Sequence, residues 1–247
     1  FSPVKFQGWY CNNCWAFAAV EAMQISRQLV SMRTKNANLE NASLLTPSPR
    51  QLGLCWAEKN KKDSMDSCQF NWHGEAFSFM VDEGMPLDGR TDYSLFSLGY
   101  GTYCNAKTFV KALTWDYVSS VPHEVASTEE IKRDLVMYGP IVTTLVFDDC
   151  LNLYGGGVFN EQQNWNVDAS GNKRLKPGNH IILIVGWDDQ KEAWLIKNSY
   201  GTEWGEDGYG WVKYGSNNIG QFAAWILADP NEKMIVHNRP VREDEFP

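Results

Sequence analysis

Cys14 and His180 have the residue types and the sequence surroundings of a nucleophile and its proton partner. A thiol attacks a carbonyl only as the thiolate, and both a helix N-terminus and a neighbouring imidazolium lower the pKa of a thiol. Cys14 stands where a helix is expected to begin, so the helix meets half of this requirement. Among the four histidines, His180 opens an otherwise apolar strand, where a polar side chain is costly to bury without a partner. The two residues together indicate nucleophilic catalysis by a cysteine.

The six cysteines leave several interpretations open. An even number suggests three disulfides, but the spacing does not give their connectivity. Cys11 and Cys14 form a Cys-x-x-Cys pair, which fits half of a zinc site, a thioredoxin-like redox pair, or one structural and one reactive cysteine. No second ligand pair follows and the flanks supply no βαβ unit, so the surroundings favour the third interpretation. We therefore expect no metal ion and no cofactor.

The elements that would position these residues change in type along the chain. Residues 14–32 contain strong helix formers without glycine or proline, and they predict a largely buried helix. Ser48 followed by Pro49 marks a second helix start. Residues 75–82 predict a third helix, and a capping box at residues 127–130 starts a fourth.

The second half of the chain is typical of β-structure. Residues 160–178 are polar and predict a long surface loop. A helical N-terminal half therefore precedes a β-rich C-terminal half, with a boundary near residues 112–125. The predicted strands lie in four short runs separated by glycine and aspartate turns, namely 140–147, 179–187, 193–197 and 209–214.

Composition argues against several classes of partner. The formal net charge is −8, whereas nucleic acid and anionic membrane surfaces both need a basic patch. No run of about 18 apolar residues exists, so we expect no membrane-spanning segment. A hydrophobic content of 43% is ordinary for a globular protein that buries a core.

Three motifs in the right order resemble the papain-like cysteine peptidase family. Residues 7–18 (QGWYCNNCWAFA) resemble the family's opening Q-G-x-C-G-S-C-W-A-F around its reactive cysteine. Residues 179–187 (NHIILIVGW) resemble its histidine strand. Residues 195–209 (LIKNSYGTEWGEDGY) resemble its K-N-S-W-G-x-x-W-G-x-x-G-Y block. The resemblance extends over residues 3–228.

This resemblance implies an α+β fold with two lobes, a helical N-terminal half and a β-barrel-like C-terminal half, and an active-site cleft between them. Residues 1–118 would form the helical lobe with the reactive cysteine, and residues 119–228 the β-rich lobe with the histidine and asparagine. Residues 229–247 would be a C-terminal tail. The activity implied is that of a cysteine endopeptidase that hydrolyses peptide bonds through a thioester acyl-enzyme on Cys14.

The resemblance also assigns roles to individual residues. Cys14 would attack the scissile carbonyl, and His180 would form the ion pair and later protonate the leaving amine. Asn198 would hold the imidazole ring through a hydrogen bond that Trp204 shields from water. Gln7 would supply a side-chain amide to the oxyanion hole, where one such donor is worth about 3 kcal/mol.

The same resemblance pairs Cys11 with Cys68 and Cys55 with Cys104. Cys150 has no partner in this scheme, and we expect a free, packed thiol there. Because disulfides persist outside the cytosol, we expect a lysosome-like or vacuolar compartment, or secretion.

The chain departs from the family pattern where substrate would bind. Phe70-Asn71 replaces two glycines that let the substrate backbone approach closely, and Tyr200 replaces a tryptophan. Ile181 replaces a small residue, which should narrow the pocket for the side chain two residues before the cut. The substrate-binding residues expected from the resemblance are Phe70, Asn71, Trp72, Asn179, Ile181 and Trp204.

Two other functions on the same scaffold stay open at this point. One is a catalytically weak or silent member that serves in binding or storage, with which the unusual Asn12-Asn13 and Phe70-Asn71 are compatible. The other is a thiol acyl-transferase or ligase, since the same cysteine–histidine pair serves when water is excluded from the acyl-enzyme.

Partners follow from the resemblance as well. We expect a peptide or protein substrate, an inhibitory prosegment and cystatin-type inhibitors. The resemblance implies a zymogen precursor, and the start at Phe1 is typical of a processed or trimmed form. We further expect a monomer that binds neither nucleic acid nor membrane.

Overall fold

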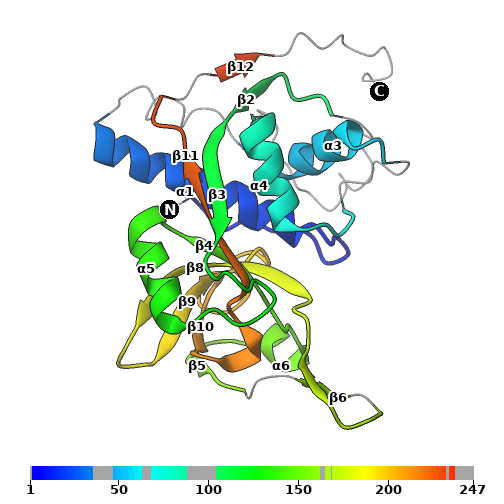
Figure 1. Cartoon of the computed structure of the whole chain (residues 1–247), viewed down its shortest axis with the longest axis vertical. Helices are drawn as coiled ribbons and strands as arrows, with labels where there is room; N and C mark the ends of the chain where they lie inside the picture. The colour runs from blue at the N-terminus through cyan, green and yellow to red at the C-terminus, as the bar shows by residue number, and fades with distance from the viewer. Residues whose placement is uncertain are drawn as a thin grey trace. The chain divides into compact units, whose positions relative to one another are not determined.

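A computed structural model describes residues 2–35, 47–62, 68–87, 104–161, 165–167, 169–231 and 234–236 (Figure 1). The chain forms two compact units. The helical unit comprises residues 7–115 and 226–247, and the sheet unit comprises residues 1–6 and 116–225. Residues 1–6 belong to the sheet unit although the helical unit follows them in sequence, and residues 226–247 belong to the helical unit although they follow the sheet unit.

Helix α1 (Cys14–Thr34) begins at the residue that the sequence predicts. Its residues are apolar around most of the circumference, and large side chains such as Trp15 and Met23 are fully buried. A helix that is hydrophobic on most faces must lie inside its unit rather than on the surface. The helix ends where Lys35 adopts a left-handed conformation and its N–H donates to the carbonyl of Ser31.

Helix α3 (Pro49–Lys59) starts as its sequence predicts. The Ser48 side chain accepts the backbone N–H of Gln51, and proline occupies the first helical position, where its missing N–H costs nothing. Helix α4 (His73–Asp82) begins two residues earlier than residues 75–82 predict, because glycine in its first turn does not stop it. Both helices pack on α1.

A small antiparallel sheet completes the helical unit. Its order is β1-β2-β12, so strand β12 brings part of the C-terminal tail into contact with the middle of the chain. The strands are β1 (Met85–Leu87), β2 (Thr108–Val110) and β12 (Met234–Val236).

Seven strands in the order β3-β11-β4-β8-β9-β10-β5 form the main sheet, most of it in the sheet unit. The four predicted runs form its antiparallel centre, β4 to β10. The two edge strands, β3 and β5, do not pair with each other, so the expected barrel-like half is an open sheet among the described residues. The strands are β3 (Ala112–Tyr117), β4 (Ile141–Leu145), β5 (Val158–Phe159), β8 (His180–Asp188), β9 (Ala193–Lys197), β10 (Tyr209–Lys213) and β11 (Gln221–Ala228).

Helix α5 (Thr128–Tyr138) packs on β4 and β8. The predicted capping box is present, because the Ser127 side chain accepts the N–H of Glu130 and the Glu130 carboxylate accepts the N–H of Ser127. Ile131 on its inner face is 1% exposed and joins the main core of the sheet unit. Burying a side chain of this size stabilises the fold by about 1.5–3 kcal/mol.

The prediction of one structureless loop over residues 160–178 is wrong. Strands β6 (Trp165–Val167) and β7 (Lys173–Leu175) pair in antiparallel fashion. Their side chains are mostly exposed and each strand has only three residues, too few for an alternating pattern to predict a strand. Two short helical turns also belong to the sheet unit, α6 (Asp149–Asn152) and η3 (Ser216–Asn218). Within the described ranges, every helix is too short or too polar to cross a membrane.

Candidate active site

Cys14 is the first residue of α1, and its side chain is buried. The N–H groups of Ala16 and Phe17 donate to the carbonyl of Asn13, the N-terminal cap residue, whose side chain makes no capping bond. The first turn contains no acidic residue. The partial positive charge at this helix end is therefore not neutralised within the helix itself, and it favours a thiolate at Cys14.

A disulfide fixes the segment that leads into α1. Cys11 and Cys68 are bonded with their Cα atoms 4.5 Å apart, and the Asn12 N–H donates to the Cys68 carbonyl at 2.9 Å. The Trp15 indole N–H reaches across to the Gln69 carbonyl at 3.0 Å. The second bridge that the resemblance implies, Cys55–Cys104, is also present. Cys11 is thus structural, which leaves Cys14 as the thiol of the Cys-x-x-Cys pair.

Gln7 lies beside this segment and is buried. One N–H of its side-chain amide donates to the Cys11 carbonyl at 2.6 Å. This bond orients the amide, which carries a second N–H. The role of Gln7 in an oxyanion hole stays a prediction.

In the sheet unit, His180 opens β8 and its ring is hydrogen-bonded to Asn198. His180 Nε2 lies 2.8 Å from Asn198 Oδ1, and the same oxygen accepts the backbone N–H of Ser199 at 2.8 Å. Because a carbonyl oxygen only accepts, Nε2 of the neutral ring must carry the hydrogen. The lone pair is then on Nδ1, so Nδ1 is the nitrogen that can take a proton from a thiol.

Burial dominates the electrostatics of His180. Its side chain is 4% exposed, and this burial lowers the pKa of His180 to about 4, whereas the hydrogen bond that the ring donates to Asn198 acts in the opposite direction. Loss of hydration disfavours the charged imidazolium. A histidine in these surroundings stays neutral at neutral pH unless a negative charge such as a thiolate comes close.

Two aromatic rings contact the imidazole. The ring centroids of Phe147 and Tyr200 lie 4.7 Å and 5.0 Å from that of His180. Trp204, the residue expected to shield the histidine–asparagine bond, packs on Phe147 at 6.3 Å and on Tyr154 at 5.4 Å. The indole N–H of Trp204 donates to the backbone carbonyl of Leu151.

Sequence reasoning missed Phe147. This residue lies two positions beyond β4, and the register that pairs Leu145 with His180 brings it to the imidazole. Such a register depends on which strands pair, so no local pattern in the sequence could have assigned Phe147 to the site.

The expected substrate-binding residues fall into two groups. Phe70, Asn71 and Trp72 precede α4 in the helical unit, and Phe70 is 55% exposed. Ile181 and Asn179 belong to the sheet unit, as does Trp204. Ile181 is buried in β8, and the Asn179 side chain is bonded to the backbone of Phe147. None of these assignments goes beyond a prediction.

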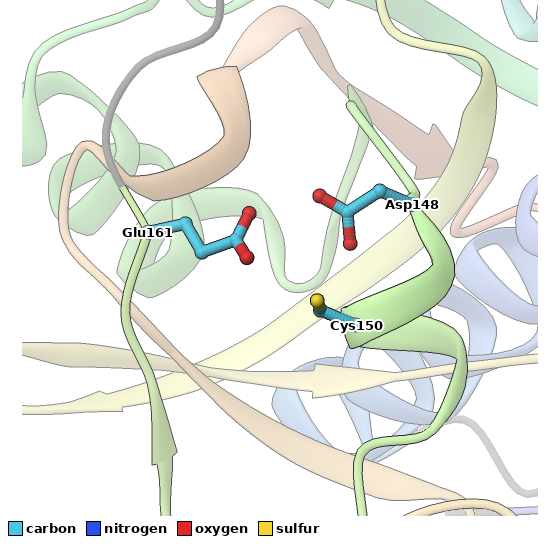
Figure 2. Close-up of side chains that lie close together, drawn as sticks. All are labelled: Asp148, Cys150 and Glu161. Atoms are coloured by element: carbon cyan, nitrogen blue, oxygen red, sulfur yellow. The ribbon is translucent and has the colours of Figure 1, made fainter.

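Cys150 also lies outside the disulfides, but its surroundings differ from those of Cys14. The side chains of Asp148, Cys150 and Glu161 point toward one another (Figure 2), with their potential metal-ligand atoms within 4.8 Å. The hydrogen bond to Asp148 raises the pKa of Glu161. The prediction that Cys150 is packed is wrong, because it lies on the exposed turn α6. The charge of Glu161 chiefly raises the pKa of the Cys150 thiol.

Comparison with protein families agrees with this geometry. The model of the papain family cysteine proteases matches residues 1–227. The chain belongs to the papain family of cysteine proteases, a class of cysteine-type peptidases.

Relatives of known name support the same class. Zingipain-2 of Zingiber officinale is 28% identical over 210 residues, which is 84% of this chain and 80% of that protein. Gamete and mating-type specific protein A of Dictyostelium discoideum is 27% identical over 223 residues, which is 90% of this chain but only 42% of that protein. The chain therefore spans less than half the length of the second relative.

Solved structures show the same fold. The cysteine protease CMS1MS2 of Carica candamarcensis, solved in complex with E-64, aligns with a TM-score of 0.63 and 20% identity, covering 93% of this chain and 94% of its own. The ragweed pollen allergen Amb a 11, a cysteine protease solved in its proform, aligns with a TM-score of 0.63 and 23% identity, covering 92% of this chain and 62% of its own. At these identities the likeness concerns the fold alone.

Proposed function

We propose that the protein is an endopeptidase in which Cys14, His180 and Asn198 carry the reaction. The observation that supports this most directly is the buried bond between His180 Nε2 and Asn198 Oδ1 at 2.8 Å, which leaves Nδ1 as the basic nitrogen. The start of α1 supplies the matching requirement on the cysteine side, a thiol in a helix end without acidic neighbours in its first turn.

The chemistry that we propose balances in two halves. The Cys14 thiolate attacks the scissile carbonyl carbon, the carbon–nitrogen bond breaks, and Nδ1–H of the imidazolium gives its proton to the leaving amine. A thioester on Cys14 remains. Water then attacks this thioester, His180 takes a proton from the water, the carbon–sulfur bond breaks, and the acid product leaves with Cys14 as the thiolate beside the imidazolium.

Gln7 and the backbone N–H of Cys14 would donate to the oxyanion during both attacks. In this proposal residues 1–118 and 119–228 are the two lobes that contribute the cysteine and the histidine, and residues 229–247 are a tail. The low pKa of the buried His180 sets one condition for this scheme. The imidazolium forms only with help from the thiolate, because burial alone disfavours the charged ring.

One assay separates peptide hydrolysis from the alternatives. The protein is mixed with a fluorogenic peptide in the presence and absence of an amine acceptor. Release of the free acid in both cases supports hydrolysis, transfer to the amine supports an acyl-transferase, and no turnover by a protein whose Cys14 is reduced supports a binding role. The last two outcomes contradict the proposal.

We further propose that Ile181 narrows the pocket for the substrate side chain two residues before the cut. The native enzyme should then prefer Val, Pro or Ala over Phe or Arg there. Ile181→Ala should raise kcat/KM for Phe more than for Val, by roughly tenfold to 200-fold, because a methylene or two in an apolar pocket is worth about 1–3 kcal/mol. Profiling a peptide library with both forms measures this, and an unchanged profile would show that Ile181 does not line the pocket.

Partners and compartment extend the same proposal. Proforms and an inhibitor complex occur among the solved structures of similar fold. We infer an inhibitory prosegment and cystatin-type inhibitors as partners of a monomeric enzyme. The two disulfides favour a lysosome-like or vacuolar compartment, or secretion.

A further inference from the structure

Phe147 is the aromatic side chain whose ring lies nearest to His180 among the contacts described above. The two ring planes are tilted by 58° at a centroid distance of 4.7 Å. The same phenyl ring meets Tyr200 edge-on at 5.3 Å, and Tyr200 itself lies 5.0 Å from the imidazole. The three rings therefore form one mutually contacting cluster in which the imidazole is the buried member and the other two are half-buried.

The backbone that carries Phe147 is held on both sides by asparagine side chains. Asn179 Oδ1 accepts the N–H of Phe147 at 2.6 Å, and Asn179 Nδ2 donates to its carbonyl at 2.9 Å. One residue earlier, the N–H of Val146 donates to the Asn217 carbonyl at 2.7 Å, and Asn217 Nδ2 donates to the Val146 carbonyl at 2.8 Å. Four bonds on two adjacent residues fix a segment that lies beyond the end of its strand.

Asn179 also links this clamp to the histidine, because it immediately precedes His180 in the chain. The N–H of Asn179 donates to the carbonyl of Leu145, which continues the β4–β8 pairing up to the clamp. Asn179 is solvent-exposed, and both groups of its side-chain amide are bonded to the backbone of a single residue. These bonds restrict the backbone of Phe147.

We propose that Phe147 is a positioning residue for the peptidase reaction: it holds the imidazole of His180 in the orientation set by Asn198 and keeps water from that side of the ring. This inference rests on the function proposed above. Asn198 fixes one ring nitrogen but permits rotation about that hydrogen bond, and ring contacts are what restrict it. Contacts between aromatic rings have preferred geometries and contribute to the orientation of each partner. Exclusion of water from the imidazole also strengthens the electrostatic interactions that Nδ1 makes during the reaction.

The charged groups nearest to this cluster along the chain are engaged elsewhere. The Asp148 carboxylate caps α6 by accepting the N–H of Leu151, and Lys197 Nζ donates to the Ser2 carbonyl. Asp149 and Cys150 lie on the exposed side of α6. Apolar cover rather than a charged neighbour therefore dominates the setting of His180, in agreement with burial as the chief cause of its low pKa.

The test compares Phe147→Ala and Phe147→Leu with Phe159→Ala. Phe159 is also half-buried against the core of the sheet unit and serves as the matched control. With a fluorogenic peptide, we expect Phe147→Ala to lower kcat by about threefold to tenfold and to change KM by less than about twofold, since the contact acts on the reaction step. Phe147→Leu should recover part of kcat, and Phe159→Ala should leave it unchanged.

A second readout does not require activity. In the Cys14→Ala background, NMR titration of His180 should give a pKa near 4, and Phe147→Ala should raise it toward the ordinary histidine value. Asn179→Ala should shift it in the same direction by less, and that variant replaces Phe147→Ala if the latter fails to fold. Unchanged kcat and unchanged titration would overturn the proposal, as would an equal effect of Phe159→Ala. If the protein lacks peptidase activity altogether, the titration still decides whether Phe147 sets the environment of His180.

Discussion

Cys14 and Cys150 both lie in the first turn of a helix, yet their electrostatic surroundings are opposite. Helix α1 has 21 residues and no acidic residue in its first turn. Helix α6 has four residues, begins after Asp148 and carries Asp149 in its first turn. Together with Glu161, these carboxylates raise the pKa of the Cys150 thiol. A helix start alone therefore does not activate a thiol, because the charges around it decide the sign of the shift.

Solvent exposure and local charge predict opposite orders of reactivity for these two thiols. Cys150 is exposed, whereas Cys14 is 3% exposed. If access to solvent controlled reactivity, Cys150 would react first. If thiolate formation controls it, Cys14 reacts first, and the following predictions distinguish these two cases.

The largest expected effect is on turnover. Cys14→Ala should lower kcat/KM for peptide hydrolysis by at least about a thousandfold, because it removes the nucleophile. Cys150→Ala should leave kcat/KM unchanged. Retained turnover in pure Cys14→Ala, with the circular dichroism spectrum of the native fold, would refute the assignment of the nucleophile.

Alkylation compares the two thiols within one molecule. At pH 6 iodoacetamide should modify Cys14 about a hundredfold faster than Cys150, because the thiolate fractions differ and only part of that difference is offset by lower nucleophilicity. Mass spectrometry of peptides after timed quenching measures both rates. Equal rates would mean that exposure, not charge, governs reactivity here.

The thiolate of Cys14 should also be visible through His180. In Cys14→Ala, the buried ring should titrate with a pKa of about 4, and in the wild type with a higher pKa, because a thiolate favours imidazolium. Cys150→Ala should titrate as the wild type does. NMR of the ring protons measures the three values.

The lowered pKa of His180 also predicts how the free energy of unfolding changes with pH. Between pH 6.5 and about pH 4 the unfolded chain binds a proton that the neutral buried ring does not, so stability decreases as the pH falls through this window. In Cys14→Ala this contribution should reach roughly 3 kcal/mol at the low end. Urea unfolding of Cys14→Ala and of Cys14→Ala/His180→Gln isolates it by difference, and parallel pH curves for the two proteins would contradict the prediction.

The smallest effect concerns the carboxylates around Cys150. Glu161→Gln removes the charge that contributes most to the raised pKa of Cys150. We expect alkylation of Cys150 at pH 8 to become about threefold faster, since salt and solvent screen charges at an exposed site. Cys14 in the same sample is the internal control and should be unaffected.

Much of the fold could be predicted because local patterns determine it. The helix start at Cys14 and the Ser127–Glu130 capping box depend on residues within a few positions of each other. Strand β8 could also be predicted from a local pattern, because its run of apolar, β-branched residues is typical of a buried strand. The β6–β7 hairpin could not be predicted, because each of its strands has only three residues and neither strand is buried against a core.

The sequence by itself determined the family, because Cys14, His180 and Asn198 stand in motifs whose order identifies it, and these three residues are the ones that we propose for the chemistry. Only the tertiary structure decided what surrounds them. The pairing of Leu145 with His180 brings Phe147 to the imidazole, and the return of the chain at Glu161 brings a carboxylate to Cys150. Both contacts join residues that are distant in sequence, so they depend on strand register and chain path, which local patterns do not specify.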